Sequence, residues 1–238
     1  RDVERSRGLG DVYKRQIYNI DGLKDILGFA QIPEYKFRLM TDIDLSALLS
    51  YYIPIFMGEF DGNNHTISNV KINTPFILFE VGFFGHLCFG GKVSNLGLVN
   101  VNITVRANKV GGLLGYNRGT VYNCYVAGNI TGDNYVGGFI GYNDSTVNNC
   151  YTIGNVNGDE YVGGFVGSNG GMLSECYAAG NVDGNRNVGG FVGNNVKLVS
   201  VCYAICNVSG SGYVGGLVGS NSDTVIDCYA TGSVTGND

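Results

Sequence analysis

The sequence predicts an all-β fold, a single-stranded right-handed parallel β-helix (β-solenoid) of 26-residue coils with a short N-terminal capping helix. The motif Val-Gly-Gly-apolar-apolar-Gly occurs five times at a constant spacing of 26 residues. A fixed period of this length is typical of solenoids and repeat arrays. The intervening segments are β-branched runs separated by Gly, Asn and Asp, without helical spacing. The motif copies begin at Val110, Val136, Val162, Val188 and Val214.

Each repeat contains three short apolar runs, so we expect three short strands per coil. Strands this short cannot bury a face alone. Stacking the coils about 4.8 Å apart would join their inward-facing columns into one continuous core. A right-handed coil is expected because parallel crossover connections nearly always take that hand.

Two adjacent columns of the repeat separate the inside from the outside. One holds Cys124, Cys150, Cys176, Cys202 and Cys228, and the next holds tyrosine in every copy. In two earlier coils, the tyrosine positions hold Lys71 and Gly97. Because lysine is almost never buried unpaired, the cysteines should face inward and the tyrosines outward. A corner is expected just before the cysteine, at residues such as Asn123 or Asn149.

A second aromatic column is harder to place. Two apolar residues follow the double glycine, and strict alternation would turn one of them outward. A corner at the double glycine would turn both inward, and we favour this arrangement because glycine suits such a corner. The tyrosines would then form the only aromatic strip in water. The undecided column is Leu113, Phe139, Phe165, Phe191 and Leu217.

The chain divides into three parts. Residues 1–16 look like a translated sequencing adapter, with a basic targeting arm as the alternative. Residues 17–80 should hold the capping helix, over 21–31 with Asp21 as N-cap, and the first irregular coils, with strands over 37–45 and 52–56. In that helix Leu23, Ile26, Leu27 and Ala30 lie at helical spacing. Residues 81–238 are repeats, which we expect to be truncated at the C-terminus.

Composition and charge restrict the class of partner. Thirty-nine glycines against three prolines suit a turn-rich β protein. Residues 110–238 carry three basic and nine acidic side chains, so nucleic acid and anionic membranes are poor partners. No apolar run reaches the roughly 18 residues of a membrane span, so no membrane insertion is expected.

The search for catalytic chemistry finds no catalytic, cofactor-binding or metal-binding set. His65 and His86 stand in no metal-binding motif, and residues 210–215 match a dinucleotide pattern that no helix follows. Three turn carboxylates, Asp42, Asp44 and Asp61, could converge on a cation, although solvated turn residues are the preferred interpretation. The column cysteines are expected to be reduced core residues, because the parallel Cβ vectors of stacked cysteines disfavour disulfides.

Two further columns have recognisable roles. Asn117, Asn143, Asn169, Asn195 and Asn221 should stack as an amide ladder. The outward tyrosines form an aromatic strip that could bind glycan or a host surface protein, with mutual stacking as the simpler alternative. This candidate ligand face consists of Tyr125, Tyr151, Tyr177, Tyr203 and Tyr229.

The 26-residue repeats, with their Val-Gly-Gly motif and the Cys-Tyr pair that follows it, resemble the GLUG repeat of bacterial surface and secreted proteins. The segment over residues 42–68, with its Phe-Asp-Gly-Asn-Asn-His-Thr-Ile-Ser end, is similar to the stretch that often precedes such repeats. The resemblance implies a β-helical stalk or adhesive region of an exported protein, including adhesins and some immunoglobulin-cleaving metallopeptidases. It implies no catalytic residues. Two departures are Cys206 at a glycine position and the apolar turn over 196–198.

The sequence therefore favours a non-catalytic structural or adhesive region, extracellular or at the cell surface and monomeric as a fragment. Alternatives are a β-helical polysaccharide-cleaving enzyme, an accessory region of a secreted metallopeptidase, and an ice-binding solenoid. The first would need clustered carboxylates or basic residues, and Lys and Arg are scarce in the repeats. The last would need an unbroken threonine column, but Met172 and Leu198 interrupt the column of Thr120, Thr146 and Thr224.

Overall fold

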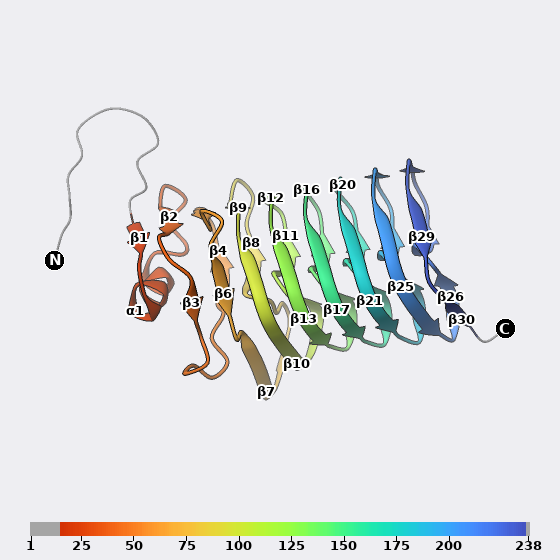
Figure 1. Cartoon of the computed structure of the whole chain (residues 1–238), viewed down its shortest axis with the longest axis horizontal. Helices are drawn as coiled ribbons and strands as arrows, with labels where there is room; N and C mark the ends of the chain where they lie inside the picture. The colour runs from red at the N-terminus through yellow and green to blue at the C-terminus, as the bar shows by residue number, and fades with distance from the viewer. Residues whose placement is uncertain (1–14, 237–238) are drawn as a thin grey trace.

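The protein is a stack of parallel β coils, a β-solenoid of about eight turns. The computed structural model describes residues 15–236. In Figure 1 the coils follow one another along the long axis, from the short helix α1 at one end to β29 and β30 at the other. Equivalent residues of successive repeats pair in parallel register, as Val136 does with Val162. The all-β parallel solenoid expected from the repeats is confirmed.

Three sheets run along the stack. The nine-stranded sheet contains β1 (Arg15–Ile17), β2 (Lys36–Leu39), β5 (Glu59–Asp61), β9 (Lys92–Ser94), β12 (Thr120–Tyr122), β16 (Thr146–Asn148), β20 (Met172–Ser174), β24 (Val199–Ser200) and β28 (Val225–Ile226). The seven-stranded sheet contains β4 (Ile53–Phe56), β8 (Phe84–Leu87), β11 (Leu114–Asn117), β15 (Ile140–Asn143), β19 (Val166–Asn169), β23 (Val192–Asn195) and β27 (Val218–Asn221).

The fourteen-stranded sheet forms the remaining walls of the coils. It contains β3 (Ile43–Asp44), β6 (Thr66–Ser68), β7 (Lys71–Leu78), β10 (Gly97–Gly111), β13 (Tyr125–Thr131), β14 (Asn134–Gly137), β17 (Tyr151–Asn157), β18 (Glu160–Gly163), β21 (Tyr177–Asp183), β22 (Arg186–Gly189), β25 (Tyr203–Gly210), β26 (Gly212–Gly215), β29 (Tyr229–Thr231) and β30 (Val234–Gly236). The long strand β10 pairs with both β13 and β14 and so joins two strand rows.

Each regular coil has four strands, so the expectation of three was wrong. One coil, for example, consists of β14, β15, β16 and β17. The unexpected strand is the row of β14, β18, β22 and β26, which ends at the first glycine of each double glycine. Glycine-rich composition lowers the apparent β propensity of this segment, although parallel pairing to the neighbouring coils holds it extended.

Left-handed backbone residues make two corners in each coil. Asn123 and Asn149 have φ angles of 54° and 50°, which confirms the corner expected before the cysteine column. Asparagine tolerates this conformation better than most residues, whereas the β-branched Val201 adopts it with φ 53° at the same place in a later coil. A second corner precedes the motif valine, at Tyr135 with φ 51° and Tyr161 with φ 59°.

The core is a set of continuous apolar columns. The side chains of Phe139, Phe165 and Phe191 are fully buried, and so is Ile140, which follows Phe139. The corner at the double glycine therefore turns both columns inward, as expected. The phenylalanine rings stack at 4.7 and 4.9 Å. Gly138 lies at this corner, where a Cβ atom would be only 2.3 Å from the next coil's Gly164 carbonyl oxygen.

The predicted amide ladder is present and lies inside. We call Asn117, Asn143, Asn169, Asn195 and Asn221 the inner asparagine ladder. Each Nδ2 donates to Oδ1 of the next member at 2.7–2.8 Å. The first four members are fully buried. Because the side-chain amides pair with one another and with their own turns, burial leaves few of their polar groups unsatisfied.

The N-terminal cap is shorter than expected. Helix α1 spans Ile20–Lys24 and continues as the 3₁₀ helix η1 over Asp25–Gly28. The N-cap is Asn19, whose Oδ1 accepts from the Gly22 amide at 2.9 Å, so the assignment of Asp21 was wrong. Glycines 22 and 28 have low helix propensity, which limits the length of the helix. Leu23 and Ile26 are buried as expected, whereas Leu27 is 50% exposed.

The first strands also differ from their expected bounds. The segment expected as one strand over 37–45 is split into β2 and β3, with a corner between them. The fold begins at β1, where Arg15 and Gln16 pair with β2, so these two residues of the segment set apart as 1–16 belong to the solenoid. Residues 1–14 lie outside the described part of the chain. Over residues 15–236 no helix is long and apolar enough to cross a membrane.

Candidate functional site: the tyrosine face

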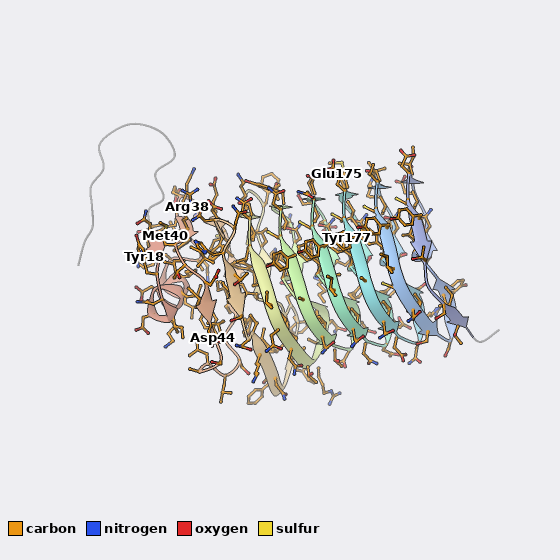
Figure 2. The ribbon with its side chains drawn as sticks, in the orientation of Figure 1. Tyr18, Arg38, Met40, Asp44, Glu175 and Tyr177 are labelled. Carbon is orange, nitrogen blue, oxygen red and sulfur yellow. The ribbon has the colours of Figure 1, made fainter. Side chains whose placement is uncertain are left out.

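The predicted ligand face lies on the outer side of the fourteen-stranded sheet. Each of its tyrosines is the first residue of its strand, and successive strands pair them in register. The cysteine before each tyrosine points into the core, which confirms the assignment of the two columns. Figure 2 shows Tyr177 on the outside of β21, within a row of rings along the stack. We call Tyr125, Tyr151, Tyr177, Tyr203 and Tyr229 the tyrosine ladder.

The ladder rings stack on one another. Successive ring centroids lie 5.0, 4.7, 4.8 and 5.0 Å apart, and their planes differ by only 3–5°. The first ring lies over Gly97, where a Cβ atom would come within 2.4 Å of Tyr125 Cζ. Most ring faces are therefore occupied, and only Tyr229, at the end of the ladder, is more than half exposed, at 56%. A ligand would meet ring edges and hydroxyl groups.

Two more outward columns complete this face. Next to the tyrosines lie Ile153 and Ile205, which are 48% and 52% exposed. Beyond them Asn129, Asn155, Asn181 and Asn207 form an outer asparagine ladder. In this ladder each Nδ2 donates to the preceding Oδ1 at 2.8–3.2 Å. The face thus repeats phenol, aliphatic and amide groups at the spacing of the coils.

Two ladder hydroxyls, those of Tyr125 and Tyr177, are held in the neutral form by their surroundings. Partial burial, reinforced by the neighbouring tyrosines, raises the pKa of Tyr125 and Tyr177 above its ordinary value. Neutral phenols can both donate and accept hydrogen bonds. The face can therefore recognise polar, uncharged groups without an ion pair.

A second group of tyrosines also lies at the surface, so the expectation of a single aromatic strip was wrong. Tyr135 and Tyr161 stack at 4.7 Å, and Tyr142 meets Tyr135 edge to face at 5.7 Å. Tyr116 meets Tyr142 at 5.5 Å with an interplanar angle of 84°. We call these four residues the seam tyrosines, because they lie on the neighbouring strand rows of β14 and β15. Tyr135 and Tyr161 stand directly before a motif valine, and Tyr116 and Tyr142 directly after the last glycine of a motif copy.

Glycine lets these two strand rows approach each other closely. A Cβ atom at Gly141 would lie 2.5 Å from the Val110 nitrogen. Only glycine permits backbones to approach this closely. The last glycine of each motif therefore lets two strand rows pack together.

A charged cluster adjoins the seam tyrosines. Glu80 bridges His86 Nδ1 and Lys109 Nζ, each at 3.0 Å. The Lys109 ammonium lies 4.1 Å from the ring centroid of Tyr116. Burial and a hydrogen bond to Asp144 raise the pKa of Tyr116 to about 12. Glu80 thus pairs with both basic side chains of the cluster, whereas His86 Nε2 is buried without a hydrogen-bond partner among the described residues.

The three turn carboxylates do not converge. Asp42 accepts from the Thr66 amide at 2.7 Å, and this bond lowers its pKa, whereas Asp44 accepts from Asn69. Asp61 is buried and pairs with Arg38 at 2.8 Å, so its interpretation as a solvated turn residue was wrong. Across residues 15–236 no three His, Cys, Asp or Glu side chains are placed to hold a metal ion. His65 lies beside Asp42 at 3.3 Å.

The column cysteines are free thiols in the core. Cys124, Cys150, Cys176 and Cys202 are each 1% exposed, and each Sγ donates to the carbonyl two residues earlier at 3.0–3.2 Å. Burial raises the pKa of Cys150 and keeps it protonated. These observations agree with the predicted role in packing. The departure Cys206 is also buried, and burial raises its pKa to about 11.

Comparison with known proteins identifies the repeat. The GLUG motif is matched at residues 107–131, 158–183 and 210–235, so the chain carries three GLUG repeats. Halomucin from Haloquadratum walsbyi is 34% identical over 49% of this chain, which spans only 2% of Halomucin. The crystal structure of a candidate immunoglobulin A1 protease from Bacteroides ovatus has a TM-score of 0.74 at 22% identity. The alignment covers 93% of this chain and 82% of the chain of that protein, and the similarity shows a shared fold.

Proposed function

We propose that this chain is a rigid, non-catalytic β-solenoid region of an exported surface protein, which sets a distance and presents the tyrosine face to a ligand. The observation that carries the proposal is the unbroken register of the coils from Val110 onward. Five motif copies without an insertion keep every column straight. A spacer needs this regularity, because an insertion in one coil would bend or interrupt the stack.

Continuous ladders support the rigidity of such a spacer. Each coil is joined to the next by backbone pairing, stacked phenylalanines and the inner asparagine ladder. Tilting one coil would strain all three together, because each of them joins every coil to the next. The GLUG repeats and the similarity to Halomucin support a place at the cell surface or outside the cell.

The tyrosine face supports an adhesive role of a particular kind. Its ring faces are occupied by neighbouring rings, so stacking of a sugar on an open aromatic face is disfavoured. Phenol and amide groups recur once per coil, which suits an extended, uncharged polymer lying along the axis. A glycan chain or an extended segment of a host protein would meet the same group at every coil.

The spacer role predicts that coils can be removed or added. Deleting residues 162–187 joins Tyr161 to Val188 and keeps the repeat in phase. We expect a folded protein whose maximum dimension in small-angle scattering falls by one coil spacing, about 4.8 Å. Duplicating the same residues should lengthen it equally. A folded variant of unchanged length would contradict the proposal, and the duplication provides a test if the deletion does not fold.

The adhesive role is tested on a glycan array and on immobilised host surface proteins. Because binding would use hydroxyl groups, changing Tyr151, Tyr177 and Tyr203 to Phe should abolish it while the ring stack remains. The matched control changes Tyr135 and Tyr161 to Phe in the seam. Binding that survives the ladder change and disappears with the seam change would place the ligand elsewhere.

A second candidate is an accessory region of a secreted metallopeptidase. It is favoured by the fold shared with a protein described as a candidate immunoglobulin A1 protease. Incubating this chain with immunoglobulin A1 separates the possibilities. A spacer should leave the immunoglobulin intact and an accessory region should bind it without cleavage, whereas cleavage would overturn the non-catalytic proposal.

A further inference from the structure

We propose that the tyrosine ladder is a site of oxidative cross-linking, in which adjacent tyrosines couple to dityrosine and join consecutive coils covalently. The observation is the geometry of the rings. Four successive pairs of phenols stand parallel within 5°, with centroids 4.7–5.0 Å apart. The stack forms through the register of the coils and does not depend on any ligand.

Parallel stacking favours this coupling because of where the new bond forms. The unpaired electron of a tyrosyl radical is shared between its oxygen and the ring carbons ortho to it, in orbitals perpendicular to the ring. Two stacked radicals therefore direct these orbitals at each other. Holding both reactants in place removes the need for a bimolecular encounter. An edge-to-face pair such as Tyr116 and Tyr142, at 84°, lacks this alignment.

The reaction balances with hydrogen peroxide as the oxidant and a haem peroxidase as the catalyst. Each phenol loses one electron and one proton, giving a phenoxyl radical. The two radicals form a carbon–carbon bond between ortho carbons, and the hydrogen on each of these carbons moves to the phenol oxygen. The pair has then lost two hydrogen atoms in total, and one peroxide has accepted two electrons and two protons to become two waters.

The consequence for the fold is a set of staples between coils. Each link joins residues 26 apart in the sequence, such as Tyr151 and Tyr177, and closes a loop of one coil. Closing a loop restricts the unfolded chain and so favours the folded stack. This would harden an exposed solenoid outside the cell in a way that the free core cysteines do not.

Two matched variants test the geometry. Changing Tyr125, Tyr203 and Tyr229 to Phe leaves the adjacent pair Tyr151 and Tyr177. Changing Tyr125, Tyr177 and Tyr229 to Phe leaves Tyr151 and Tyr203, which are separated by two coil spacings, about 9.6 Å. Both variants keep two ladder tyrosines and five stacked rings. Both also carry Tyr161→Phe, because Tyr135 and Tyr161 form another parallel pair, at 4.7 Å and 5°, that could couple by the same geometry. Each is treated with peroxidase and hydrogen peroxide at low protein concentration, and monomers are analysed by dityrosine fluorescence and peptide mass spectrometry.

The adjacent variant should give a monomer that has lost two hydrogen atoms, with the link mapped between residues 151 and 177. The separated variant should yield at least tenfold less of a link between its ladder tyrosines. The linked monomer should also unfold at higher denaturant concentration than its untreated form.

Equal yields in the two variants would overturn the proposal. So would coupling confined to Tyr18 and Tyr213, which are 58% and 63% exposed and outside the ladder, because accessibility would then govern the reaction. Absence of any ladder link, while free tyrosine dimerises under the same conditions, would overturn it as well.

Discussion

The inner asparagine ladder gives a quantitative test of what holds the coils together. In the middle of the ladder, Asn169 donates to Asn195 at 2.8 Å and accepts from Asn143 at 2.8 Å. It also makes two bonds to its own turn, donating to the Gly171 carbonyl at 3.1 Å and accepting from the Gly171 amide at 3.2 Å. Changing Asn169 to Ala removes these four bonds, together with a longer one from Nδ2 to the Leu198 carbonyl at 3.4 Å, and leaves their partners buried.

The expected loss follows from these contacts. Four net hydrogen bonds at about 1 kcal/mol each give about 4 kcal/mol of unfolding free energy. Some partners keep a second bond, as Asn143 does to the Ser145 carbonyl at 2.9 Å, which lowers the total. We therefore expect Asn169→Ala to destabilise the protein by about 3–5 kcal/mol.

The control is the same substitution at the end of the same ladder. Asn221 is exposed and can exchange its bonds to Asn195 and Asp223 for bonds to water. We expect Asn221→Ala to cost less than about 1 kcal/mol. Denaturant unfolding followed by circular dichroism measures both, and amide hydrogen exchange locates the loosened coil. Equal losses at the two positions would refute the idea that burial gives the ladder its stabilising role.

Three further outcomes are expected. Val201→Asn should stabilise the protein by about 1 kcal/mol in denaturant unfolding, because Asn tolerates the left-handed backbone that Val adopts there with φ 53°. An unchanged denaturant midpoint would contradict this prediction. In the native state Cys150 should resist alkylation, whereas Cys228, half-buried at the end of the same column, should react. Both cysteines should react after unfolding without reductant. Rapid labelling of Cys150 in the native state would contradict its buried position. The pKa of Tyr116 is about 12 in the fold against an ordinary 10.0, so its contribution to stability is complete below pH 10 and is lost as pH rises toward 12. The fall in thermal stability over that range should be shallower in Tyr116→Phe, and identical profiles would contradict the assignment.

Much of the fold could be predicted because the repeat averages out local ambiguity. A single Cys-Tyr pair does not tell inside from outside, but Lys71 at an equivalent tyrosine position does. Five copies of the double glycine likewise located a corner that one copy would not. Successive side chains of a strand point to opposite faces, so counting residues separates inward from outward positions wherever the backbone stays extended.

The missed fourth strand has a clear physical cause, which is a left-handed residue that interrupts alternation. Tyr135 and Tyr161 precede a buried valine and would be assigned by simple counting within one strand. Their positive φ angles form a corner there. Any L-residue with a Cβ is disfavoured in this conformation, so no residue type marks the position as glycine would. The fourth strand was missed for this reason.

The two tyrosine groups show why placement on a surface is not sufficient to assign a binding role. In the ladder, register alone fixes the rings, and their faces are shielded by one another. In the seam, edge-to-face contacts and the Lys109 ammonium fix the rings instead. A sugar that stacked on a ladder tyrosine would have to displace another tyrosine, so a ligand gains little from ring contact there. Recognition along the ladder must therefore depend on hydroxyl and amide groups, and this is why Tyr→Phe, which leaves the stack in place, is the more informative substitution than Tyr→Ala.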